Sequence, residues 1–179
     1  MRWGRHILVA IAGAAVLAVS IPASATVSEA DVKAAFLPRF ARYVTWPPSA
    51  TPSRSNPYVL CVIGGDPFGG GLDSAARTQS VDGRRIIVRH LDSASGAGDC
   101  HIAYVSGSRG QSVGQMLAEL HGKPVLTVTD SRNGGSRGII HFSVVDGRVR
   151  FYIDEAEASS DGLAISSRLL ALAIGVKQR

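Results

Sequence analysis

The sequence predicts an α/β fold: a mixed, mostly parallel sheet with a C-terminal antiparallel hairpin and helices on both faces. Short apolar runs alternate with segments of helical periodicity through the middle of the chain, which is typical of a largely parallel sheet. Near the end, two strand-like segments flank Asp146-Gly147, a residue pair that favours a tight β-hairpin turn. The 154 residues that follow position 25 are enough for one domain with its own core.

The first 25 residues are predicted to be a cleaved secretory signal peptide. Arg2 and Arg5 precede an uncharged stretch at 7–22, and Ala23-Ser24-Ala25 supplies the small residues of a cleavage site. The apolar run inside this stretch has 13 residues, fewer than the about 20 that span a bilayer. The alternative is an uncleaved membrane anchor. We expect residues 26–179 to form a single mature domain, outside the cytoplasm, with no membrane span.

The first predicted helix begins after Ser28, whose hydroxyl can cap the first turn. Its apolar residues recur at three- and four-residue spacing: Val32, Ala35, Phe36, Phe40 and Tyr43. Pro38 is expected to kink this helix, and Trp46-Pro47-Pro48 to end it. The aromatic residues of the segment are core residues in one interpretation and a contact patch for a partner in the other: Phe36, Phe40, Tyr43 and Trp46.

The later elements follow from the same patterns. Strands are predicted at 58–63, 85–90, 101–106, 125–129, 139–145 and 148–153, and helices at 72–77 and 113–121. The final segment, Leu163–Val176, is rich in Leu and Ala and is predicted to be one long apolar helix with Gly162 at its start.

The charge distribution argues against nucleic-acid binding. The leader contains two of the 19 Lys and Arg residues and none of the 14 acidic ones, so the formal charge of the mature chain is +3. Its arginines are scattered, except for Arg84, Arg85 and Arg89, and no basic stripe alternates with aromatic residues.

No motif indicates catalysis, a cofactor or a metal. The sequence lacks G-x-S-x-G and H-x-x-x-H, and four histidines of the mature chain are dispersed: His90, His101, His121 and His141. The densest acidic cluster surrounds a predicted helix start, where carboxylates stabilise the helix dipole: Asp154, Glu155, Glu157 and Asp161. His121 is expected at a helix C-terminus. We therefore expect no enzyme, no cofactor and no metal site.

Two glycine-rich loops are the remaining candidates for a small-ligand site. Residues 64–71 follow a predicted strand but lack the Lys and Ser/Thr of a phosphate loop. Residues 134–138 lie beside Arg132 and Arg137 and could form an anion-binding nest. Simple turns are the favoured interpretation of both loops. Binding of an anion or a nucleotide stays the alternative function.

Cys61 and Cys100 are the only cysteines. Secreted proteins usually pair their cysteines, so a disulfide is favoured over two free thiols.

Two segments resemble the opening and closing segments of the YfiR-like family: Val32–Pro47 and Gly147–Ala173. Between them, the segments 58–72, 99–106 and 125–130 and the pair Gly134-Gly135 occur in the order and spacing of that family. The resemblance covers nearly the whole mature chain. The chain departs from the family pattern in two respects: Pro38 replaces an aromatic residue, and a second cysteine pair found in some members is missing.

The resemblance implies a periplasmic regulatory protein rather than an enzyme. The best-known member represses an inner-membrane diguanylate cyclase by binding its periplasmic sensor domain. That member can dimerise, and an outer-membrane lipoprotein sequesters it. The positions of Cys61 and Cys100 match a family disulfide. For this chain we expect as partners the periplasmic domain of an inner-membrane diguanylate cyclase or sensor kinase, an outer-membrane lipoprotein and a second copy of itself. The expected contact surface is the first helix, through Phe36, Phe40, Tyr43 and Trp46.

Overall fold

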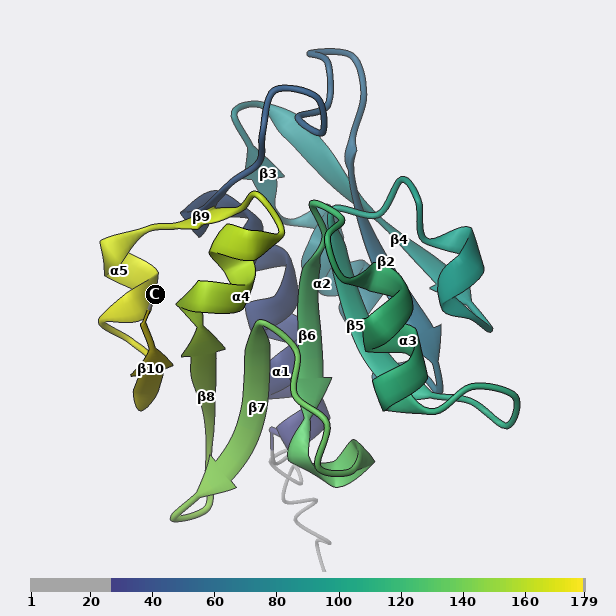
Figure 1. The fold of residues 1–179 in the computed structure, drawn as a ribbon, viewed down its shortest axis with the longest axis vertical. Helices are drawn as coiled ribbons and strands as arrows, with labels where there is room; N and C mark the ends of the chain where they lie inside the picture. Colours follow the sequence, from purple (N-terminus) through teal and green to yellow (C-terminus); the bar gives the residue numbers. More distant parts are fainter. Residues whose placement is uncertain (1–26, 179) are drawn as a thin grey trace, which may run out of the picture.

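The computed structural model describes residues 27–178, so the predicted signal peptide lies outside the described part. Within that part, the centre of the molecule is an eight-stranded sheet with strand order β10-β8-β7-β6-β5-β2-β4-β3 (Figure 1). The strands are β1 (Val44–Thr45), β2 (Tyr58–Gly64), β3 (Ser80–Val81), β4 (Arg84–Leu91), β5 (Ile102–Gly107), β6 (Leu126–Asp130), β7 (Ile140–Val145), β8 (Arg148–Asp154), β9 (Ala164–Ile165) and β10 (Gly175–Lys177). The helices are α1 (Glu29–Phe40), α2 (Gly70–Arg77), α3 (Val113–Leu120), α4 (Glu155–Ser160) and α5 (Ser167–Leu170), with short 3-10 turns η1 (Ala41–Tyr43), η2 (Ala94–Gly96) and η3 (Ser131–Asn133).

The sheet is mixed and mostly parallel, as the sequence predicts. Strands β4, β2, β5, β6 and β7 run parallel to one another, whereas β8 is antiparallel to β7 and β3 is antiparallel to β4. β10 pairs in parallel with β8 at one edge. β1 and β9 form a separate antiparallel pair. The predicted fold class is confirmed.

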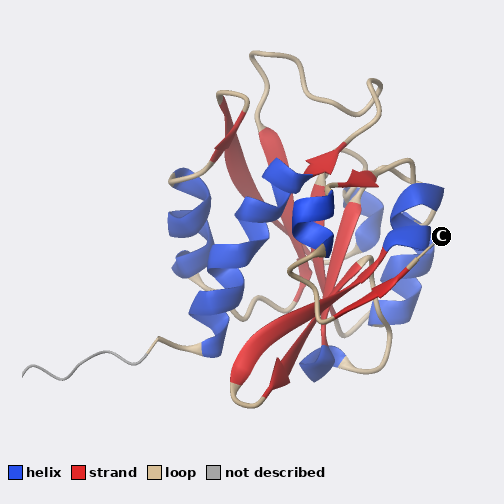
Figure 2. Cartoon of the chain, turned by 90° about the vertical axis from the view of Figure 1, so that its left-hand side faces the viewer, coloured by secondary structure: helices blue, strands red, loops and turns tan. Residues whose placement is uncertain are grey.

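Helices cover both faces of the sheet, which Figure 2 shows from the side. α1 and α2 pack against each other on one face, over the larger apolar core. α3 and η2 cover the other face beside β5, over a smaller core. Among the described residues, no helix combines the length and apolar character needed to cross a membrane.

The β7–β8 hairpin forms where the sequence predicts it. Asp146 and Gly147 have φ angles of 50° and 69°, the left-handed values that a tight hairpin turn requires at both central positions. Val144 lies opposite Val149 in the register, and Val145 lies opposite Arg148. Because neighbouring residues of a strand point to opposite faces, Val144 and Val145 expose apolar surface on different sides of the hairpin.

The first helix begins as predicted and ends earlier. Ser28 caps α1 in a capping box with Asp31, whose pKa is lowered by hydrogen bonds from the Ser28 side chain and backbone. Pro38 lies inside the helix. The α-helix ends at Phe40, and the chain continues through η1 into β1, so Trp46 follows a strand rather than a helix.

The prediction of one long helix at Leu163–Val176 is wrong. Gly162 has a φ of 76°, and Ala164–Ile165 then pairs with β1 as β9. Ser166 caps the four-residue α5, and the chain ends its described part in β10 against β8. A Cβ on Gly175 would lie 2.9 Å from the Tyr152 ring, so any larger residue at that position would displace this ring. Strand pairing with distant segments therefore overrides the helical pattern of this segment.

Candidate functional site

The four predicted contact residues divide into two buried and two half-buried side chains. Phe40 is 1% exposed and Trp46 is 4% exposed, whereas Phe36 and Tyr43 are half-buried. The Phe40 ring centroid lies 5.5 Å from that of Phe151, within a cluster that also includes Phe36. Phe40 and Trp46 therefore belong to the core and offer almost no surface to a partner. Of the four, Phe36 and Tyr43 keep surface in reach of one.

Phe36 lines a groove between α1 and the β7–β8 hairpin. The groove has a volume of about 430 Å³. Its apolar lining comes from both elements and from Val27, which precedes α1: Val27, Val32, Phe36, Val144 and Val149. Its charged lining comes from Glu29, Arg148 and Arg150. Val27 is 76% exposed and Val144 is 43% exposed, so this α1–hairpin groove presents apolar side chains to solvent.

A buried ion cluster fixes α1 beside the sheet. Lys33 points from α1 into the protein and forms ion pairs with Glu29 and with Asp130, the last residue of β6. The Lys33 and Asp130 side chains are 3% and 4% exposed. Arg132 forms a further ion pair with Glu29, and the backbone N–H of Arg132 donates to Asp130. The cluster holds the first turns of α1, which form one wall of the α1–hairpin groove, at the end of β6.

The glycine-rich loop after β2 is a packed turn, as the favoured interpretation predicts. A Cβ on Gly64 would lie 2.0 Å from the carbonyl oxygen of Gly107, and the backbone N–H of Gly65 donates to that oxygen. Asp66 accepts the backbone N–H of Phe68, whose ring packs 4.7 Å from that of Tyr104. Burial raises the pKa of the Tyr104 hydroxyl. The backbones at the ends of β2 and β5 are therefore in direct contact.

A polar pocket of about 780 Å³ lies near the ends of β4 and β5, between η2 and α3. Arg109 lines it, together with Asp92 and Gln111. The Gln111 amide is occupied within the protein, since its oxygen accepts the Ala94 N–H and its nitrogen donates to Glu119. Binding of an anion or a nucleotide therefore stays a prediction.

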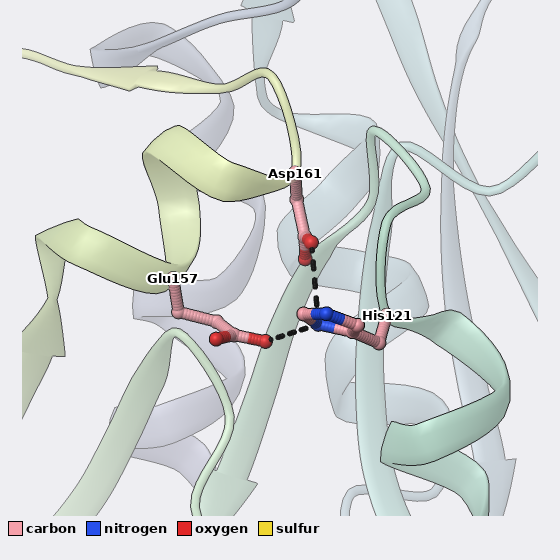
Figure 3. A group of neighbouring side chains, drawn as sticks. All are labelled: His121, Glu157 and Asp161. Carbon is pink, nitrogen blue, oxygen red and sulfur yellow. Dashed lines mark hydrogen bonds and ion pairs between the residues drawn. The ribbon is translucent and has the colours of Figure 1, made fainter.

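His121, Glu157 and Asp161 form a cluster that joins the ends of α3 and α4 (Figure 3). The His121 Nδ1 atom lies 2.8 Å from Glu157 Oε1 and 3.7 Å from Asp161 Oδ1. The hydrogen bond with Glu157 raises the pKa of His121, and burial raises the pKa of Asp161. His121 is at a helix C-terminus as predicted. Asp154, Glu155 and Glu157 are at the start of α4 as predicted, whereas Asp161 is the C-cap residue at its other end. The sequence patterns point to each of the three residues of this cluster but not to their proximity in the fold.

A family model described as YfiR/HmsC-like matches residues 30–174. The chain belongs to the YfiR/HmsC-like family. The match confirms the family to which the sequence segments pointed, and it includes the β7–β8 hairpin and all of α1 except Glu29. No curated protein matches the chain.

The disulfide expected for a YfiR/HmsC-like chain is present. Cys61 of β2 is bonded to Cys100, just before β5, and both residues are buried. His101 is turned to other partners: its Nδ1 atom accepts the backbone N–H of Val59, and its ring packs against Tyr58. Burial lowers the pKa of His101. The bridge therefore ties the start of β5 to β2 inside the smaller core.

Proposed function

We propose that this chain is a periplasmic regulatory protein that binds the periplasmic sensor domain of an inner-membrane diguanylate cyclase and represses cyclic di-GMP synthesis. Membership of the YfiR/HmsC-like family carries the proposal, because that family regulates diguanylate cyclases from the periplasm. The signal-peptide pattern of residues 1–25 supports the same compartment. Cleavage after Ala25 would leave residues 26–179 as the mature domain.

The mechanism is a population shift. A protein outside the inner membrane has no access to the cytoplasmic catalytic domain, so it acts through the part of the cyclase that faces the periplasm. Binding that is tighter to the inactive state than to the active state moves the cyclase toward inactivity, and release restores synthesis. If about 99% of the unbound cyclase is active, reducing the active fraction to about 1% requires roughly 10⁴-fold tighter binding to the inactive state.

The α1–hairpin groove is the contact surface that we propose. Of the four contact residues predicted from the sequence, this groove includes Phe36. It does not include the buried Phe40 and Trp46, and its other apolar surface comes in part from the hairpin. Arg148 and Arg150 line the groove, whereas Glu29 is already paired with Lys33 and Arg132. This charge pattern suits an apolar segment of the cyclase sensor domain with acidic residues beside it.

Val144 and Val145 allow a matched test of this surface. Both are exposed, at 43% and 38%, and they are neighbours in β7, but only Val144 lines the groove. We expect Val144→Glu to weaken binding to the purified periplasmic domain of the cyclase by about 30-fold, the loss of a typical hot-spot contact. Val145→Glu keeps the affinity of the unchanged protein. Circular dichroism and thermal melting establish that both variants are folded.

Surface plasmon resonance with the immobilised cyclase domain provides the measurement, and the domain is chosen from genes adjacent to this one. Loss of binding in Val145→Glu alone would place the contact on the opposite face. Absence of binding by the unchanged protein would refute the cyclase as partner. The sensor kinase, the outer-membrane lipoprotein and the homodimer are the other partners that the family resemblance suggests, and the same variants test them.

A further inference from the structure

Three metal-binding side chains converge at one point between α3 and α4. The His121 Nδ1, Glu157 Oε1 and Asp161 Oδ1 atoms belong to a group whose ligand atoms all lie within 4.8 Å of one another. Zinc–ligand bonds of about 2.0–2.2 Å in a tetrahedral site place ligand atoms about 3.3–3.6 Å apart. The two measured separations from the His121 nitrogen, 2.8 and 3.7 Å, lie on either side of that range. Figure 3 shows both carboxylates directed at the imidazole ring.

The backbone holds the three side chains in place without a metal. Glu157 is in the first turn of the short helix α4 and Asp161 is its C-cap residue, and the Asp161 N–H donates to the Glu157 carbonyl. The Asp161 carboxylate is buried and accepts the N–H of Gly122, the residue after His121. Because Gly122 has a φ of 75°, the chain turns sharply there and presents His121 beside α4. Little side-chain ordering is left for a ligand to impose.

The charge of the cluster favours a cation. Two carboxylates face one imidazole, so the group carries a net negative charge even when His121 is protonated. Lys177 also lies within electrostatic range of Glu157, but its ammonium group pairs with Asp154 at 2.9 Å.

We propose that His121, Glu157 and Asp161 bind Zn²⁺, with water in the fourth coordination position. One imidazole nitrogen and two carboxylate oxygens are a donor set that zinc accepts, whereas Ca²⁺ and Mg²⁺ prefer six or more oxygen ligands. The His121 side chain is 57% exposed and that of Glu157 is 40% exposed, so the ion and its water reach the site from solvent. Bound zinc joins α3 to α4. This inference does not depend on the proposed cyclase partner.

His90 provides a matched control elsewhere in the chain. It also lies near two carboxylates, but Asp66 approaches its Nδ1 atom at 3.7 Å and Asp73 approaches its Nε2 atom at 3.9 Å. The two carboxylates approach different nitrogens of the ring, so a single ion bound to one of these nitrogens cannot also contact both carboxylates. His90 is thus a half-exposed histidine near two carboxylates whose oxygens do not meet at one point.

Isothermal titration of the untagged mature chain with zinc chloride tests the proposal. We expect one equivalent of zinc per chain in the micromolar range or tighter, and a higher melting temperature with zinc because only the folded chain has the site. His121→Ala and Glu157→Gln each weaken binding by more than the roughly 10–100-fold that loss of an outer-shell partner costs. His90→Ala binds as the unchanged chain does.

Cobalt(II) gives a readout that a purely structural contact does not affect. The unchanged chain with Co²⁺ should show the visible absorption of a low-coordinate site, and His121→Ala should lose it. Asp161→Asn keeps an oxygen for the Gly122 N–H and serves as a second variant if His121→Ala is unfolded. No saturable binding at millimolar zinc, or equal binding by all variants, would overturn the proposal.

Discussion

Removal of the buried Lys33 ammonium group is predicted to destabilise the protein strongly. In Lys33→Met the Asp130 carboxylate, in a side chain only 4% exposed, loses its cationic partner. Breaking a buried ion pair in this way costs about 3–5 kcal/mol. Glu29 keeps Arg132, and Asp130 keeps the Arg132 backbone N–H, so we expect the lower end, about 3 kcal/mol. Domains of this size are stable by about 5–15 kcal/mol, so the loss is a large fraction of the total.

Two further variants separate the buried charge from the lost packing. Lys33→Met combined with Asp130→Asn removes the uncompensated carboxylate and keeps an oxygen for the Arg132 N–H, so it should recover about 1.5 kcal/mol or more. Arg89→Met breaks an ion pair with Asp99 whose side chains are 37% and 66% exposed, and should cost less than about 1 kcal/mol.

Urea unfolding followed by circular dichroism measures all of these free energies. The reasoning would be refuted if Lys33→Met and Arg89→Met cost the same, or if the double variant were less stable than Lys33→Met. In either case, the Lys33–Asp130 pair would not be what holds α1 against β6.

The remaining predictions concern the disulfide, the His121 cluster and the aromatic core. Replacing Cys61 and Cys100 together by Ala opens a loop of sequence separation 39 and should lower the unfolding free energy by about 4 kcal/mol, as measured in urea without reductant; an unchanged value would contradict the chain-entropy argument. His121 has a raised pKa in the folded chain, so its contribution is full below the unfolded value of about 6.5 and is lost as pH rises through the folded value. With a chelator present, His121→Ala should therefore lose more stability at mildly acidic than at alkaline pH, and a gap independent of pH would be inconsistent with the ion pair. Phe40→Ala should cost about 3–5 kcal/mol in the same urea assay because its ring is buried among other rings; a loss under about 1 kcal/mol would return Phe40 to the candidate contact residues.

Local signals in the sequence predict most of the sheet. A few neighbouring residues are enough to predict the apolar strands β2, β5 and β6 and the turn at Asp146-Gly147. The same kind of turn signal was present and missed at Asp82-Gly83, where φ angles of 49° and 77° connect β3 to β4. The residues that cap α1 and α3, Ser28 and Ser112, are also local.

The C-terminal segment and the candidate sites depend on contacts between distant residues. The Leu- and Ala-rich pattern after Gly162 favours a helix locally, but β9 pairs with β1 and β10 pairs with β8. Likewise, His121 and Glu157 are 36 residues apart, and the sequence contains no spacing motif that joins them. Burial of Phe40 follows from α1 lying against the β7–β8 hairpin, and burial of Trp46 follows from its packing against Tyr58 and His101. Helical periodicity alone does not reveal either contact.

Cellular cyclic di-GMP tests the central claim most directly. The measurement compares a strain lacking this gene with the same strain supplied with the unchanged gene, with Val144→Glu or with Val145→Glu. A repressor that docks through the α1–hairpin groove predicts raised cyclic di-GMP in the deletion strain, restored by the unchanged gene and by Val145→Glu but not by Val144→Glu. Cyclic di-GMP that is the same in all four strains would contradict the account.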